Sequence, residues 1–245
     1  MKIKIKFINR IILLAITLVN ILPSLAVILN PLLFIMFIPI GLYAFLTWPW
    51  PVLKDIPDPF RPGESLYWLT YAIQLNEEHG ILLPTIFNWG LIDLILVCAG
   101  SIIFVYSFTQ WLINLKKRRG LMTGGMYRLV RHPQYLGLIL LALGLTIKSL
   151  RPASIIGWIT LLVSYLIMAS LEEKSLINTY GERYLTYATK VPFLVPYIKF
   201  NLPDWLSVNK PWRYALFIAI WILSISLVIA IMRNYVFSLR NIAFQ

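Results

Sequence analysis

Long apolar runs separated by short polar segments dominate this sequence. A membrane-spanning helix needs about 20 mostly apolar residues, and the charge-free run 11–48 is too long for one upright span. Asn30-Pro31 divides this run, because the residue before a proline disfavours the helical conformation. Only the five residues 148–152 separate two later runs, which predicts a short helical hairpin. The predicted spans are about 8–29, 32–48, 88–115, 134–147, 153–171 and 213–232. The expected fold is an all-α, polytopic membrane bundle with about six transmembrane helices.

The composition also indicates a membrane protein. Hydrophobic residues make up 59% of the chain and charged residues 13%, and the mean hydropathy is +0.76. A soluble domain carries about 25% charged residues, so a water-soluble globule is excluded, and disorder requires the opposite balance. The single cysteine, Cys98, excludes a disulfide framework, and with only two histidines no metal site is expected. The net charge is +12, and the basic residues flank apolar runs, so membrane lipids rather than nucleic acid are the expected partner.

Basic residues predict which side of the membrane each polar segment faces. Segment 116–131 carries six Lys and Arg residues, and the positive-inside rule puts such segments in the cytoplasm. The hairpin returns the chain to the same side, so 172–211 is expected there too. Counting back puts the acidic segment 49–87 outside, but it also puts the basic N-terminus outside, against the rule. Either 11–48 crosses an odd number of times or the N-terminus is an exception.

The first segment with chemical potential is Arg131-His132-Pro133, followed by Tyr135 and Gly137. Proline suits the first turn of a helix, where its missing N–H costs nothing, so His132 is expected at the helix cap. Free backbone N–H groups and Arg131 would make this helix start a good anion site. The alternative is a basic cytoplasmic loop with a satisfied capping histidine.

The second segment is Glu172-Glu173, after a long apolar helix, followed by a tyrosine-rich stretch with Tyr184 and Tyr187. Paired carboxylates at the end of a membrane helix are costly unless they are paired or solvated. The tyrosines recur at helical spacing and form either an interfacial belt or a stacking wall for a planar base. Because the hairpin brings both segments together, they can form a pocket for a zwitterionic, aromatic cation such as S-adenosylmethionine.

The ordered combination of Arg131-His132-Pro133 and, after one hairpin, Glu172-Glu173 resembles the signature of the isoprenylcysteine carboxyl methyltransferase family. The tail from Tyr180-Gly181-Glu182 to Val191-Pro192 is also similar to that family, and the resemblance covers about residues 117–197. It implies an integral membrane methyltransferase that uses S-adenosylmethionine and has its cofactor pocket on the cytoplasmic side. The implied acceptor is lipophilic or small: an isoprenylcysteine-like carboxylate, a thiol or a lipid amine.

The resemblance also implies roles for particular residues and a division of the chain. The resemblance implies catalytic roles for Glu173, His132 and Arg131. Positioning of the reactants is favoured over proton transfer as that role. The implied cofactor-binding residues are Arg131, His132, Pro133, Tyr135, Gly137, Glu172, Glu173, Tyr184 and Tyr187. The expected regions are N-terminal transmembrane helices with the polar loop 49–87 (1–115), a cofactor-binding core (116–200), and a C-terminal transmembrane helix and tail (201–245).

Two other classes of function compete with this prediction. A membrane NADPH-dependent reductase of the sterol type is similar in its His-Pro-x-Tyr helix start, but Leu138 stands where those reductases carry an acid. A non-enzymatic carrier would give a role to Asp93, a lone acid within a span, but it would not explain the paired glutamates and clustered tyrosines. Glu77-Glu78-His79 could form a further polar site, although adjacent polar residues in a loop are more often simply solvated.

Overall fold

The computed structural model describes residues 31–47, 90–117, 120–149, 151–198 and 203–243. In these ranges the secondary structure is helical and no strand occurs. The α-helices are α2 (Pro31–Thr47), α3 (Leu91–Lys116), α4 (Pro133–Ser149), α5 (Pro152–Tyr180), α6 (Glu182–Lys190) and α7 (Pro211–Ala243). Two short 3-10 helices, η4 (Gly125–Arg128) and η5 (Asp204–Leu206), lie in the connections.

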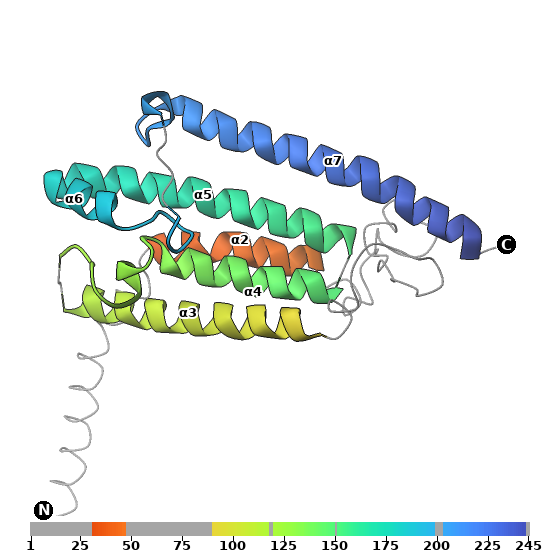
Figure 1. Ribbon diagram of the computed structural model, residues 1–245, viewed down its shortest axis with the longest axis horizontal. Helices are drawn as coiled ribbons and strands as arrows, with labels where there is room; N and C mark the ends of the chain where they lie inside the picture. The colour runs from red at the N-terminus through yellow and green to blue at the C-terminus, as the bar shows by residue number, and fades with distance from the viewer. Residues whose placement is uncertain (1–30, 48–89, 118–119, 150, 199–202, 244–245) are drawn as a thin grey trace, which may run out of the picture.

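The helices α2, α3, α4 and α5 lie side by side in one bundle (Figure 1). The short helix α6 folds back at the end of α5, and α7 lies along α5 on the outside of the bundle (Figure 1). The expected hairpin is formed by α4 and α5, which contact each other after a very short connection. This hairpin brings the residues before α4 to the same end of the bundle as the last turns of α5.

Glycines allow α3 and α4 to pack closely. A Cβ atom at Gly137 would lie 2.6 Å from the backbone nitrogen of Phe104, and one at Gly144 would lie 2.7 Å from the carbonyl oxygen of Asp93. Real side chains do not tolerate such distances, so these positions need a residue without a side chain. Gly137, which the family resemblance assigns to the cofactor site, lies at this helix–helix contact.

Buried tyrosines attach α2 to the hairpin. The Tyr43 hydroxyl donates a hydrogen bond to the Ala142 carbonyl at 3.1 Å, and the Tyr165 hydroxyl donates one to the Met36 carbonyl at 3.0 Å. A buried hydroxyl without a partner would cost free energy. These bonds therefore fix the position of α2 against both α4 and α5.

Within the described residues, three helices are long and apolar enough to cross a membrane, judged by length and composition: Leu91–Lys116, Pro152–Tyr180 and Pro211–Arg233. Phe34–Thr47 and Pro133–Ser149 are shorter apolar helices. The structure therefore supports an all-helical membrane protein, and the expected count of six spans stays a prediction. The expected span 8–29 and loop 49–87, including Glu77-Glu78-His79, lie outside the described residues.

The helix boundaries differ from the expected ones at the end of α5. The sequence predicts that this helix ends before Glu172-Glu173, but it continues to Tyr180. Glutamate, lysine and leucine are good helix formers, and Gly181, with a φ of 51°, provides the actual C-terminal stop. Both glutamates therefore lie inside a helix, which determines how their side chains point.

Candidate functional site

The start of α4 lies against the segment that follows α6. Pro133 begins α4, and the carbonyl of His132 accepts a hydrogen bond from the amide of Leu136 at 3.1 Å, as expected of a helix cap. The amide of Arg131 donates to the carbonyl of Pro192 at 2.9 Å. This backbone bond holds the helix start at the end of the bundle where α5 and α6 meet.

Glu173 is the centre of a buried cluster of polar side chains. It is only 4% exposed, and its carboxylate forms an ion pair with the Arg131 guanidinium. The Tyr184 hydroxyl donates a hydrogen bond to the same carboxylate oxygen at 3.0 Å, and His132 Nε2 lies 3.6 Å from it. A buried carboxylate is stable only when it is paired and hydrogen-bonded, and this cluster meets both conditions.

Glu172 has different surroundings from Glu173. Consecutive helical residues point about 100° apart, so the two carboxylates face different directions. The Glu172 carboxylate lies 3.3 Å from His132 Nδ1, and its side chain is 46% exposed. The imidazole of His132 therefore lies between the two acids, and Glu172 keeps free surface that a ligand can contact.

The surroundings of His132 favour its charged form. Burial alone lowers the pKa of this imidazole, but hydrogen bonding and charge interactions with Glu172 and Glu173 raise its pKa overall above the usual 6.5. The ring stacks on Tyr135, with 5.7 Å between centroids, and forms a T-shaped contact with the Phe193 ring, with 5.2 Å between centroids. His132 is thus a buried imidazole held between two carboxylates and two aromatic rings.

The tyrosines of α6 hold this helix against the site. Burial raises the pKa of both Tyr184 and Tyr187, so their hydroxyls stay protonated and act as donors. Tyr187 donates to the carbonyl of Tyr127 at 2.6 Å, which connects α6 to η4. The two tyrosines expected at the cofactor site therefore make structural hydrogen bonds around it.

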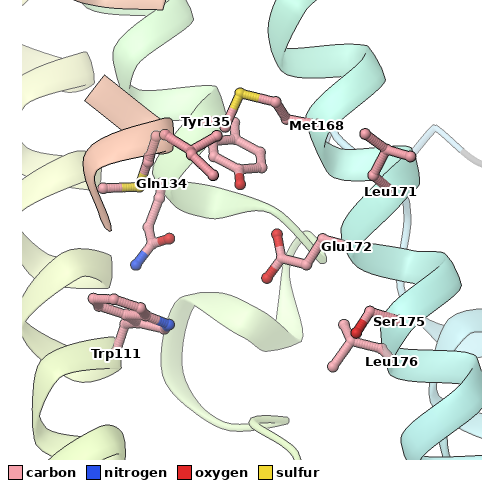
Figure 2. A pocket seen from close by; sticks show the side chains of 10 residues that line it. Trp111, Gln134, Tyr135, Met168, Leu171, Glu172, Ser175 and Leu176 are labelled. Carbon is pink, nitrogen blue, oxygen red and sulfur yellow. The ribbon is translucent and has the colours of Figure 1, made fainter. Parts of the chain in front are cut away.

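A cavity of about 350 Å³ opens beside this cluster. In Figure 2 the Glu172 carboxylate from α5 and the Gln134 amide from α4 point toward the same space, and the Trp111 indole from α3 lies beside it. Gln134 Nε2 is buried and has no hydrogen-bond partner among the described residues. The cavity is lined by Ile35, Met36, Trp111, Gln134, Tyr135, Met168, Leu171, Glu172, Ser175 and Leu176.

The structure thus brings most of the expected site residues together in two adjoining groups. One group is the buried cluster of Arg131, His132, Glu173 and Tyr184. The other consists of the cavity residues, which include Tyr135 and Glu172. Among the described residues no group of His, Cys, Asp or Glu is arranged to hold a metal ion.

Sequence reasoning missed Trp111, Gln134 and Phe193. Gln134 occupies the variable position of the His-Pro-x-Tyr motif, and its place within this motif could have indicated that it belongs to the site. Trp111 and Phe193 carry no comparable signal, because their place at the site depends on how α3 packs and how the chain turns after α6.

The chain is thus a multi-helix membrane protein with a largely apolar cavity, which carries a few polar groups, next to a buried Arg–Glu–His cluster. Residues 84–183 match the family model described as phospholipid methyltransferase. This range includes both motifs at the site.

Individual relatives agree with the family model. Protein-S-isoprenylcysteine O-methyltransferase A of Arabidopsis thaliana is 32% identical over 117 residues, which cover 45% of this chain and 59% of the relative. The Xenopus laevis protein-S-isoprenylcysteine O-methyltransferase is 37% identical over 81 residues, which cover 32% of this chain and 28% of the relative. Methanethiol S-methyltransferase of Pseudomonas deceptionensis is 29% identical over 148 residues, which cover 56% of this chain and 55% of the relative. No solved structure matches the chain.

The resemblance to the isoprenylcysteine carboxyl methyltransferase family is confirmed by these comparisons. The chain spans 59% or less of the length of each of the three relatives. The relatives are named for methyl transfer to different acceptors, an isoprenylcysteine in two cases and methanethiol in the third.

Proposed function

We propose that this protein is an integral membrane methyltransferase that uses S-adenosylmethionine to methylate a lipophilic or small acceptor. The observation that carries the proposal is the cavity of about 350 Å³ with Glu172 and the unpartnered Gln134 amide at its wall, where Glu172 contacts His132 of the buried cluster. Ligand cavities typically begin at about 300 Å³, so the space suits a compact cofactor.

The chemical groups around the cavity suit this cofactor. Glu172 offers a partly exposed carboxylate for an ammonium group, and Trp111 and Tyr135 offer aromatic faces for a planar base or a sulfonium. The start of α4, with Arg131, offers backbone N–H groups and a cation for a carboxylate. When bound, S-adenosylmethionine supplies an electrophilic methyl group. The protein's task is then to hold donor and acceptor in line and to exclude water.

Arg131, His132 and Glu173 are proposed to act in catalysis by positioning. Glu173 fixes Arg131 through the ion pair and faces His132 from the other side. Because charge interactions with Glu172 and Glu173 raise the pKa of His132, positioning rather than proton abstraction is the role proposed for the imidazole. Pro133 begins α4, Gly137 lets it pack on α3, and Tyr184 and Tyr187 hold α6 over the site.

The proposed cofactor-binding core is 116–200, with Ile35, Met36 and Trp111 added from the preceding helices. The apolar wall of the cavity suggests that the acceptor enters laterally from the bilayer, between helices. The basic segment 116–131 next to the site supports a cytoplasmic location for the pocket.

The test is methyl transfer by the purified, detergent-solubilised protein from methyl-labelled S-adenosylmethionine. Three acceptors represent the three classes: N-acetyl-farnesylcysteine, a short alkyl thiol and phosphatidylethanolamine. We expect label in one acceptor class, with an equal amount of S-adenosylhomocysteine formed, and loss of both products in Glu172→Gln. Absence of labelled product with all three acceptors, in protein that binds S-adenosylhomocysteine, would contradict the proposed acceptor classes.

A further inference from the structure

A buried arginine near the start of α7 connects this helix to the candidate site. Arg213 is only 6% exposed, although it lies directly before the charge-free stretch 214–232 of α7. Its Nε donates a hydrogen bond to the Ser170 hydroxyl at 3.0 Å, and its Nη1 donates one to the Leu206 carbonyl at 3.4 Å. Burial of a cation is costly without such partners, so these contacts determine where the guanidinium lies.

Phe193 lies between Arg213 and the site. The Arg213 guanidinium carbon is 5.3 Å from the centre of the Phe193 ring, and the Arg131 guanidinium carbon is 5.4 Å from the same centre. The His132 imidazole contacts this ring at 5.2 Å between centroids. Cations within about 6 Å of a ring centre are attracted to its face, so one ring contacts two arginines and the capping histidine.

The second contact of Arg213 also leads to the site. Ser170 precedes Glu173 by three residues in α5, so the two side chains lie on the same face of that helix. Arg213 thus contacts α5 one turn before Glu173, and it contacts the ring that packs on Arg131. It is not among the residues that line the cavity, and it lies outside the matched range 84–183.

We propose that Arg213 is a positioning residue for the methyl-donor site, and that it acts by holding Phe193 and Ser170 so that Arg131 and His132 stay in register with Glu173. This inference rests on the proposed function, because it assumes that the site binds the methyl donor. It makes α7 a part of the site rather than only a membrane anchor.

The test compares Arg213→Met with two control variants on the same helix. Tyr214→Phe removes the hydrogen bond from the neighbouring hydroxyl to the Val208 carbonyl, 2.9 Å long, and Phe217→Leu removes the other ring near Arg213, at 5.7 Å. The measured quantity is the Kd of S-adenosylhomocysteine for the full chain in detergent, by calorimetry. We expect Arg213→Met to raise the Kd about tenfold and each control to change it less than about twofold.

Coupling to Phe193 separates positioning from a general loss of stability. Phe193→Leu is expected to raise the Kd by a similar factor. The double variant, Phe193→Leu with Arg213→Met, should have a Kd no higher than that of the weaker-binding single variant. Arg213→Lys, which keeps a cation near the ring, should recover most of the affinity. Ser170→Ala, which removes the Nε acceptor, should raise the Kd about threefold and serves as the test if Arg213→Met does not fold.

Wild-type affinity in Arg213→Met, or in Ser170→Ala where the former does not fold, overturns the inference. So do fully additive losses in the double variant, and so does an equal loss in Tyr214→Phe, since either result means that α7 is needed only as an anchor. Failure of the wild-type chain to bind S-adenosylhomocysteine would instead refute the proposed function, on which the inference rests.

Discussion

The two adjacent glutamates of α5 are expected to differ sharply when each is changed to glutamine. Glu173→Gln keeps the shape of the side chain and an oxygen for the Tyr184 hydroxyl, but it removes the charge that pairs with Arg131. Breaking a fully buried ion pair costs about 3–5 kcal/mol. The Arg131 side chain is 16% exposed and His132 can release its proton, so we expect a smaller loss of stability, about 2–3 kcal/mol.

Glu172→Gln provides the matched comparison. The Glu172 side chain is 46% exposed, so solvent screens its interaction with His132 and the loss of stability should be about 0.5 kcal/mol or less. Its carboxylate lines the cavity, so this variant should lose affinity for S-adenosylhomocysteine, whose ammonium it is proposed to bind. A charge-assisted hydrogen bond of about 1.5–3 kcal/mol corresponds to a Kd raised by about 10- to 150-fold.

Two assays on the same detergent-solubilised preparations separate these effects. The thermal unfolding midpoint should fall by about 4–12 °C in Glu173→Gln and by about 2 °C or less in Glu172→Gln. Calorimetric titration with S-adenosylhomocysteine should show the larger specific loss in Glu172→Gln. Equal destabilisation by the two substitutions, or wild-type affinity in Glu172→Gln, would refute the division of roles between the two acids.

Three further predictions follow from the packing and charge of the site. The raised pKa of His132 means that its ion-pair stabilisation is complete below about pH 6.5 and is lost as the pH rises through the raised value; the thermal midpoint of the wild type should fall as the pH passes through that value, and that of His132→Gln should not. Gly137→Ala forces a Cβ to within 2.6 Å of the α3 backbone and should destabilise by about 1–3 kcal/mol, whereas Gly124→Ala, with nothing within 4 Å, should leave the midpoint unchanged. Gln134→Leu removes the unpartnered buried amide and should preserve the midpoint while raising the Kd of S-adenosylhomocysteine about tenfold; wild-type affinity in this variant would show that the amide does not contact the ligand.

The approach of Arg131 and His132 to Glu173 could be predicted from the sequence. A hairpin with a very short connection must return the chain to the end of the bundle where it began, and α4 and α5 do so. The start of α4 at Pro133 could also be predicted, because a proline in the first helical turn is a strong local signal.

The different directions of the Glu172 and Glu173 side chains could not be predicted in the same way. They depend on the continuation of α5 to Tyr180, and the change from an apolar to a polar sequence at Glu172 suggested an earlier end. A loss of hydrophobicity marks where a helix leaves an apolar environment, but it does not terminate the helix; Gly181 does.

The places of Trp111 and Phe193 depend on tertiary packing. Trp111 reaches the cavity because glycines set the approach of α3 to α4, and a helix–helix register of this kind leaves no periodic signal in one sequence. Phe193 reaches Arg131 and Arg213 because the segment after α6 is bonded to the start of α4, through the Arg131 amide and the Pro192 carbonyl. Arg131 and Arg213 lie far apart in the sequence, and their shared contact with the Phe193 ring arises only in the folded chain.

The most direct test of the proposed methyltransferase function is calorimetric titration of the purified, detergent-solubilised protein with S-adenosylhomocysteine, with NADPH titrated in parallel. We expect saturable binding of S-adenosylhomocysteine alone, and loss of this binding in Glu172→Gln at an unchanged thermal midpoint. Binding of NADPH instead would contradict the account and favour a reductase. Binding of neither ligand by folded protein would equally contradict it and favour a carrier without a methyl donor.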